Sequence, residues 1–388
     1  MQIINVVTAA DAAAFFKLPL YIYKNDPNWI QPLDKDVMEV FDKTKNKTFR
    51  NGILERWIVK NESGMVVGRI AAFTNSKYKN KGDQFPVGGV GFFECINNQL
   101  VANLLFDTAK QWLLQQGMQA MDGPINFGER DRWWGLVNKG FMEPMYCMNY
   151  NLPYYVALFE NYGFKVFFEQ VCFSMHPKSP LDPKIWSRHQ ELQKDANFSS
   201  DHLHKNNIAK YAQDFTSVYN KAWAGHGGLK QISFEQVKSM FTKMKPVMDE
   251  KIITFVYYKK EPVALFVNIP DLNQWFKYLH GKFGLIQKLK FLFIKQFKKN
   301  KKFAGLVFGV VPEWHGKGVD AYLIGEAARY IQSPESPYTE YEMQWIGDFN
   351  PKMLNIASNL GAVFRSRNLC TYRYIFDRNM PFERHPIL

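Results

Sequence analysis

The sequence predicts an α/β protein made of two consecutive units, each a mixed β-sheet flanked by helices. The chain has 388 residues, of which 46% are hydrophobic and 22% charged, enough to bury more than one core. Residues 174–184 are rich in proline and polar side chains, as in a linker. The same order of elements is expected on both sides of this linker, which indicates a duplicated unit at 1–178 and 185–388.

In the first unit, hydrophobic periodicity predicts six elements. They are, in order, a hairpin (56–73), a strand (90–95), a helix (102–113), a strand (118–122), a helix (154–161) and a strand (165–174). The first helix carries apolar residues on one face from Ala102 to Leu113 and ends at Gly117. The second helix stops at Gly163, since glycine readily adopts the left-handed conformation that ends helices.

The second unit repeats this order. Its elements are a hairpin (253–268), a strand (304–311), a helix (319–332), a strand (338–345), a helix (350–359) and a strand (371–376). Gly361 ends the second helix and lies 198 residues after Gly163. The two hairpins have nearly the same spacing, so duplication explains the pattern better than chance does.

Composition restricts the class of protein. The chain has no stretch of 18 or more uncharged apolar residues and no signal-peptide pattern at its start, and its four cysteines are scattered. These features favour a cytoplasmic protein without a disulfide framework or a zinc site. The net charge of +13 is uneven: residues 1–180 hold 19 Lys+Arg against 17 Asp+Glu, and residues 181–388 hold 30 against 19. The second half is therefore expected to meet an anionic partner.

One turn in the second half has the pattern of an anion-binding site. Residues 310–320 read Val-Val-Pro-Glu-Trp-His-Gly-Lys-Gly-Val-Asp and connect the strand at 304–311 to the helix at 319–332. Successive backbone N–H groups and the positive end of the helix attract a phosphate there. Gly316 and Gly318 let the backbone approach the anion closely, and Lys317 adds charge.

This order of elements resembles the GNAT acyl-CoA N-acyltransferase fold. The turn is similar to that family's acyl-CoA loop, V-x-P-x-[YW]-[RQ]-G-K-G-[IV]-G, with His315 and Asp320 departing from it. The resemblance therefore implies acyl-CoA binding in the second half. The residues implied are Val311, Glu313, His315, Gly316, Lys317, Gly318, Val319, Asp320 and Asn350. The first half has no glycine at the equivalent turn, 96–101, so we expect it to have lost CoA binding.

A second resemblance is narrower and covers nearly the whole chain. The segments 122–128, 135–141, 143–145, 149–155 and 161–164, with 314–321 and 345–350, are similar to tandem-domain bacterial proteins that include the bacterial ceramide synthases. That branch implies N-acylation of a long-chain, sphingoid-like lipid base by an acyl-CoA. The family's general-acid tyrosine is replaced in both halves, by Phe159 and by Ala357.

Three residues are candidates for the catalytic base that acyl transfer to an amine requires. Glu342 lies on the strand after the CoA-loop helix, where it is either such a base or part of a solvated strand face. Glu94 is an acid inside an apolar strand, hence paired or functional, and could line the acceptor site. His226 lies in a glycine-rich loop and has a suitable pKa range, although surface histidines are common in such loops. No metal site is expected.

Residues 282–302 contain eight lysines and no acid, and interrupt the second unit between hairpin and strand. As a helix, this segment places Leu285, Leu289, Phe293 and Phe297 on one stripe beside lysines. Basic amphipathic helices of this kind lie on anionic membrane surfaces. The alternative is a helix whose stripe packs on its own domain. Nucleic acid is not expected, because no recognised binding signature is present.

The sequence thus predicts an N-acyltransferase that joins an acyl group from acyl-CoA to an amine, at the inner surface of the membrane. Two alternatives stay open. One is a small-molecule N-acetyltransferase, which needs neither lipid nor membrane. The other is a catalytically inactive GNAT-fold scaffold that binds a lipid or a protein; Asp320 and the replaced tyrosine favour it.

Overall fold

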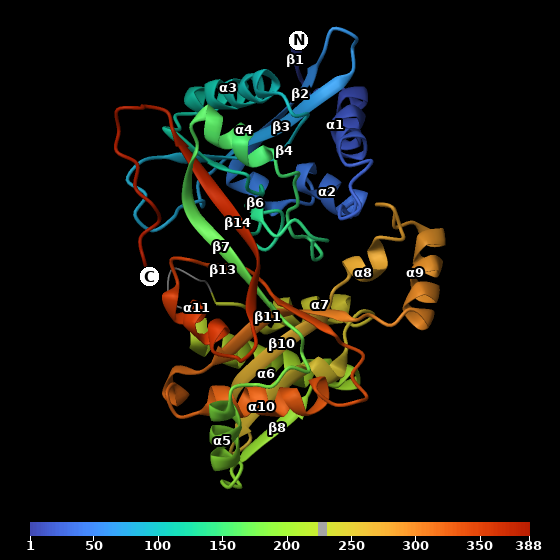
Figure 1. The fold of residues 1–388 in the computed structure, drawn as a ribbon, viewed down its shortest axis with the longest axis vertical. Helices are drawn as coiled ribbons and strands as arrows, with labels where there is room; N and C mark the ends of the chain where they lie inside the picture. The colour runs from blue at the N-terminus through green and yellow to red at the C-terminus, as the bar shows by residue number, and fades with distance from the viewer. Residues whose placement is uncertain (224–230) are drawn as a thin grey trace.

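A computed structural model describes residues 1–223 and 231–388 (Figure 1). These residues form a single mixed β-sheet with helices on both faces. The strand order along the sheet is β1-β2-β3-β4-β5-β14-β7-β12-β11-β10-β9-β8, and the short strands β6 and β13 pair with β14 and β7. The predicted α/β class is confirmed.

The N-terminal part of the sheet follows the predicted order. Its strands are β1 (Gln2–Asn5), β2 (Gly52–Lys60), β3 (Val66–Asn75), β4 (Val87–Cys95), β5 (Ala120–Gly123) and β6 (Leu136–Lys139). Strands β1 to β4 are antiparallel neighbours and β5 is parallel to β4. The helices are α1 (Ala9–Ile22), α2 (Asp34–Phe41), α3 (Gln99–Gln115) and α4 (Tyr155–Tyr162), with the 3₁₀ turn η1 (Lys47–Arg50).

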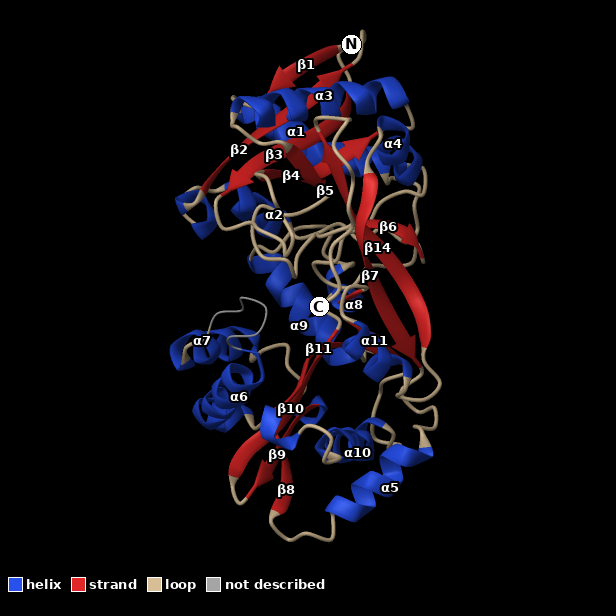
Figure 2. Cartoon of the chain, turned by 90° about the vertical axis from the view of Figure 1, so that its left-hand side faces the viewer, coloured by secondary structure: helices blue, strands red, loops and turns tan. Residues whose placement is uncertain are grey.

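The C-terminal part repeats this arrangement. Its strands are β8 (Phe198–His202), β9 (Ile253–Tyr258), β10 (Glu261–Pro270), β11 (Lys302–Val310), β12 (Glu340–Met343) and β13 (Ile346–Gly347). Its α-helices are α5 (Pro183–Leu192), α6 (Ile208–Trp223), α7 (Phe234–Met244), α8 (Asn273–Phe276), α9 (Leu285–Phe297), α10 (Val319–Ile331) and α11 (Pro351–Ser358). Three 3₁₀ turns are η2 (Lys205–Asn207), η3 (Glu250–Ile252) and η4 (Pro312–Trp314). Figure 2 shows α6 and α7 on one face of this part of the sheet and α10 on the other.

The two parts exchange their last strands. β7 (Lys165–Met175) leaves the N-terminal part and pairs with β12 through Met175 and Ser174, while β14 (Phe364–Ile375) returns and pairs with β5 through Tyr372 to Ile375. β7 and β14 also pair with each other along most of their length, and both run through the middle of the molecule in Figure 1. Each part of the sheet therefore contains a strand from the other half of the sequence.

Two glycines end helices as the sequence predicts. Gly163 follows α4 with φ of 107°, and Gly361 follows α11 with φ of 129°, a region that other residues rarely adopt. The linker expected at 174–184 is shorter at both ends in the structure. β7 runs to Met175, and α5 begins at Pro183 and packs on α10. In the described residues, no helix is long and apolar enough to cross a membrane.

Two strands differ in length from the sequence prediction. β14 begins at Phe364, whereas only 371–376 was expected as a strand. Its first residues, Phe-Arg-Ser-Arg-Asn, lack the apolar alternation that would identify a strand from the sequence. They form a strand because they pair with β7 of the other part. The strand expected over 338–345 is reduced to β12, because the chain departs from β11 after Met343.

Candidate functional site

The turn between β11 and α10 has an open backbone. Gly316 and Gly318 have φ of 73° and 81°, and Gly318 is the N-cap residue of α10. No side chain of the described residues caps this helix, and the space that a Cβ of Gly316 would occupy is empty to 4 Å. The N-terminal N–H groups of α10 therefore remain available to an anion.

The side chains of this turn divide into two groups. Val311 and Val319 are buried and fix the turn on the core, whereas Glu313, His315, Lys317 and Asp320 are exposed. The His315 ring bonds the Val310 carbonyl (2.9 Å), and the Lys317 ammonium lies 5.1 Å from the Trp314 ring centre. An anion at the turn would thus be near the Lys317 ammonium and the Asp320 carboxylate in the first turn of α10. Gly318 itself is buried, and the Arg188 and Leu192 side chains of α5 lie against it.

Below α10, the parallel strands β11 and β12 separate. Their pairing stops at Gly305 and Met343, and the Gln344 N–H then donates to the Gly305 carbonyl (3.1 Å). A groove of about 100 Å³ lies beside the separation. Its walls are almost wholly apolar and come from α10, α11 and the strands, among them Phe308, Ile324, Ala328, Met343, Met353 and Ile356. Asn350 caps α11 by accepting from the Met353 N–H (3.2 Å).

The equivalent place in the N-terminal part is already filled. The Asn98 side chain caps α3 by accepting from the N–H groups of Leu100 and Val101. At the end of β4, the Cys95 N–H donates to the Tyr155 hydroxyl (3.0 Å), and the Tyr154 hydroxyl donates to the Cys95 carbonyl (2.6 Å). The N-terminal N–H groups of α3 are therefore partly occupied by the Asn98 side chain, whereas no side chain of the described residues accepts from those of α10.

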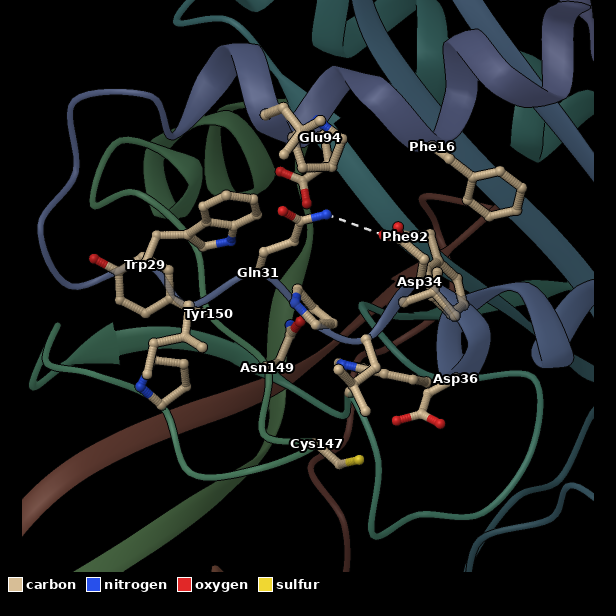
Figure 3. A pocket seen from close by; sticks show the side chains of 18 of the residues that line it. Phe16, Trp29, Gln31, Asp34, Asp36, Phe92, Glu94, Cys147, Asn149 and Tyr150 are labelled. Carbon is tan, nitrogen blue, oxygen red and sulfur yellow. Dashed lines mark hydrogen bonds between the residues drawn. The ribbon is translucent and has the colours of Figure 1, made fainter. Parts of the chain in front are cut away.

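The N-terminal part instead holds a cavity of about 460 Å³ (Figure 3). It lies between α1, α2, the end of β4 and the segment 133–151, and residues 280–282 from the second half border it. Aromatic side chains, Phe16, Trp29, Phe92 and Tyr150, form much of its wall. Glu94, Gln31, Asp34 and Asn149 supply polar groups.

Glu94 is a buried carboxylate of this cavity, 9% exposed. Both the Tyr23 and the Tyr155 hydroxyls donate to its Oε2 (2.7 Å each), and Arg69 Nη2 lies 3.4 Å from its Oε1. Burial raises the pKa of Glu94, and the Arg69 charge and the tyrosine hydrogen bonds offset this only in part. Burial likewise raises the pKa of both tyrosines, so their hydroxyls stay protonated and act as donors.

Other polar groups of the cavity are paired or unreactive. Gln31 donates to Asp34 (3.0 Å), and Tyr146 donates to Asp36 (2.6 Å). Burial raises the pKa of Asp34, and it raises the pKa of the Cys147 thiol to about 12. Cys147 is therefore a neutral thiol and a poor nucleophile at neutral pH.

Glu342 occupies a different kind of position. It is 1% exposed, its Oε2 lies 2.6 Å from the Lys302 ammonium, and its Oε1 lies 3.2 Å from Arg367 Nε. Arg367 also donates to the carbonyls of Met142 and Glu143. Glu342 lines neither the groove nor the cavity. This setting favours a structural ion cluster, which ties β11, β12 and β14 together, over the predicted role as base.

The remaining candidates are not brought together by the structure. His226 lies outside the described residues and stays a prediction from the sequence. Glu94 is in the cavity, which contains no residue of the 311–320 turn. The cavity and the strand separation adjoin the same apolar cluster, however, because Met148 of the cavity, Ala304 and Trp345 all belong to it. In the described residues, no group of three or more metal-ligating side chains gathers.

Sequence reasoning missed the partners of Glu94. Arg69 could have been predicted as a partner, because the antiparallel register of β3 and β4 places Arg69 opposite Glu94. Tyr23 and Tyr155 come from helices 71 and 61 residues away in the sequence, and no local pattern connects them to a strand carboxylate.

Comparison with known proteins identifies the fold. The chain matches no protein-family profile. It is 23% identical over 359 residues to protein YghO of Escherichia coli, spanning 91% of this chain and 90% of that protein. It is 24% identical over 375 residues to the bacterial ceramide synthase of Caulobacter vibrioides, spanning 93% and 94%.

Two solved structures have similar folds. One is a tandem GNAT protein from the clavulanic acid biosynthesis pathway, with a TM-score of 0.53, 11% identity and coverage of 98% and 99% of the two chains. The other is a GCN5-related glucosamine N-acetyltransferase region in a fungal multi-domain GH3 β-N-acetylglucosaminidase, with a TM-score of 0.52 and 12% identity; the match spans 96% of this chain and 38% of that one. The chain therefore has the tandem GNAT fold that the order of elements predicts.

Proposed function

We propose that this protein is an N-acyltransferase that moves an acyl group from acyl-CoA to the amine of a long-chain, sphingoid-like lipid base. The observation that carries the proposal is the turn before α10, where Gly316 and Gly318 are left-handed and no side chain of the described residues caps the helix, together with the strand separation and the apolar groove below α10. The similarity to a bacterial ceramide synthase over nearly the whole chain supports the lipid acceptor.

The turn is the proposed donor site. The pyrophosphate of the CoA would lie on the N–H groups of Gly316 to Val319, where Lys317 adds positive charge. The pantetheine and the acyl chain would follow the groove below α10. Its apolar walls suit an aliphatic chain, and they contain no charged side chain that could pair with a charged group. We place Asn350 at the far edge of this site, as the cap of α11.

The cavity is the proposed acceptor site. Its aromatic walls suit a hydrocarbon chain, and the Glu94 and Asp34 carboxylates suit an ammonium group. Met148 of the cavity belongs to the same apolar cluster as Ala304 and Trp345, which flank the strand separation, so we propose that donor and acceptor meet beside this cluster.

The reaction requires only the amine, the thioester and one base that takes a proton. The neutral amine attacks the thioester carbonyl carbon, the C–N bond forms, and the C–S bond breaks with release of the CoA thiolate. One proton leaves the nitrogen, and we propose Glu94 as its acceptor because burial brings the pKa of this carboxyl closer to neutral pH. The low pKa of a thiol makes departure without a tyrosine acid tolerable.

The test is an assay with purified protein, a sphingoid base or a water-soluble amine, and palmitoyl-CoA, acetyl-CoA or no CoA, read by mass spectrometry. We expect the N-palmitoyl amide of the sphingoid base. Acetylation of the water-soluble amine alone would establish the small-molecule alternative instead. Absence of both product and acyl-CoA binding would favour the inactive scaffold.

A pair of matched variants tests the donor site separately. Gly316→Val should weaken acyl-CoA binding at least about tenfold in calorimetry, since a side chain there covers the open backbone. Gly64→Val is the control, because Gly64 also has positive φ and open space but lies in the β2–β3 hairpin turn. Both variants carry the same backbone strain, so equal acyl-CoA affinities in the two would defeat the proposed site.

A further inference from the structure

Helix α9 turns its apolar stripe away from the molecule. Phe291 is its one buried residue and packs on Trp275, Phe276 and Leu279. Six large apolar side chains of this helix are exposed, between 57% for Leu292 and 80% for Leu285; the others are Ile286, Leu289, Phe293 and Phe297. Surfaces of this kind are rare on soluble proteins and mark contact with a protein or a membrane.

The charge around the stripe is entirely positive. Lys288, Lys290, Lys298 and Lys299 are exposed, and residues 282–302 contain no acid. Lys290 donates to the Tyr278 carbonyl and Lys298 contacts the Tyr278 hydroxyl, which holds these ammonium groups at the base of the helix. Exposed apolar side chains flanked by lysines complement an anionic lipid surface, where hydrocarbon lies beneath phosphate.

Two exposed residues that line the cavity, His280 and Lys282, shortly precede this helix in the chain. The exposed lining residues of the cavity are Ala13, Lys17, Leu20, Met38, His280 and Lys282. Lys282 precedes the first residue of α9 by three positions, and the neighbouring Gly281 carbonyl accepts from the Asp34 N–H (2.7 Å), which fixes this turn on α2. Figure 1 places α9 on the outer side of α8, at the edge of the molecule.

We propose that α9 is an interfacial helix that holds the protein on an anionic membrane, with the exposed lining of the cavity facing the lipid. A single-chain amphiphile could then pass from the bilayer into the cavity without crossing water; this last step rests on the proposed function. A second copy fits less well, because a two-fold contact would place lysines against lysines. Nucleic acid would leave six apolar side chains without a partner.

The experiment is vesicle flotation of the full chain with phosphatidylcholine alone and with phosphatidylcholine containing 30% phosphatidylglycerol. We expect binding to the anionic vesicles, weakened by salt. The variant Leu289→Ser/Phe293→Ser should lower the partition coefficient at least about tenfold, since two inserted side chains are lost. Both residues are exposed, so the variant keeps its fold. Leu100→Ser, 66% exposed on α3, is the matched control and should bind as the wild type does.

Three outcomes overturn the inference: no binding to anionic vesicles, equal partition of the double variant and the wild type, or a concentration-dependent dimer in sedimentation that the double variant abolishes. Acylation of a short-chain sphingoid base that dissolves in water, measured without vesicles, is the separate readout for the proposed function. The double variant should retain it. Vesicle binding without any acyl transfer refutes the proposed function alone, and transfer without vesicle binding refutes the membrane helix alone.

Discussion

Glu94 and Glu342 are both buried strand carboxylates, yet their surroundings give them different chemistry. Glu342 faces two cations at short distance and lines neither the cavity nor the groove described above. Glu94 faces one weakly placed cation, two tyrosine hydroxyls and a cavity. The sequence alone identified both as candidate bases, Glu94 as an acid inside an apolar strand and Glu342 by its place on the strand after the CoA-loop helix. It could not distinguish them, because the difference is made by Arg367, Tyr23 and Tyr155, which are distant along the chain.

At Glu342, the ion cluster predicts a loss of stability rather than of chemistry. Glu342→Gln should lower the free energy of unfolding by about 3 kcal/mol, because Lys302 and Arg367 are left as buried charges without a counter-ion. Urea unfolding measures this, with Glu340→Gln as the control, an exposed acid on the same strand that should change it by less than about 0.5 kcal/mol. An equally stable but inactive Glu342→Gln protein would restore Glu342 as the base.

At Glu94, the raised pKa predicts a dependence on pH. The folded protein holds the proton more tightly than the unfolded chain, whose carboxyl has the ordinary value of 4.5. The contribution of Glu94 to stability is therefore complete below that value and is lost as pH rises through the folded pKa. Relative to Glu94→Gln, the wild type should lose unfolding free energy across this range.

Urea unfolding of both proteins at a series of pH values checks this dependence. Glu62 is an exposed acid in the β2–β3 turn and serves as the control. The free energy of unfolding of Glu62→Gln should vary with pH as that of the wild type does. Constant separation between wild type and Glu94→Gln at every pH would show that the carboxyl ionises as it does in water. Product formation by the wild type should rise with pH through the same range if Glu94 takes the amine proton, and Glu94→Gln should lose that rise.

At the scale of elements, local patterns predicted the repeated part well. The hairpins, the strands β4 and β11, and the helices α3, α4, α10 and α11 were all expected from periodicity and glycine stops. The turn before α10 was recognisable because two glycines between a strand and a helix are a local signal. The helices α1, α2, α6 and α7 were not predicted, and α1 is apolar around most of its circumference, which weakens its periodicity.

Helix α9 was expected, and the sequence left open whether its stripe is exposed or packs on its own domain; in the structure the stripe is exposed. Periodicity indicates that Leu285, Leu289 and Phe293 share a face. Whether that face meets the protein or the solvent depends on Phe291, which anchors the opposite side on α8. The cavity was also beyond reach, because its walls come from α1, α2, β4 and residues 280–282, which only the folded chain assembles.

At the scale of the whole molecule, the strand exchange makes each half complete the core of the other. Cys370, Tyr372 and Tyr374 of β14 belong to the core between α3, α4 and the N-terminal strands. Val171, Phe173 and Met175 of β7 belong to the core below α10. The duplication was readable from the sequence, whereas the exchange was not, because an end strand has the same pattern whichever sheet it joins.

The exchange predicts that neither half folds alone. A fragment of residues 1–178 lacks β14, so it would expose the edge of β5 and the part of the core that Tyr372 covers in the intact chain. A fragment of residues 185–388 lacks β7, so it would expose the edge of β12. We expect each fragment to lack a cooperative unfolding transition in near-ultraviolet circular dichroism and to aggregate. Co-expressed, they should form a stable 1:1 complex, because β7 and β14 then pair as in the intact chain, which should unfold in one transition. A cooperatively folded 185–388 fragment would instead show that the halves are independent domains, and the strand exchange would then contribute little to stability.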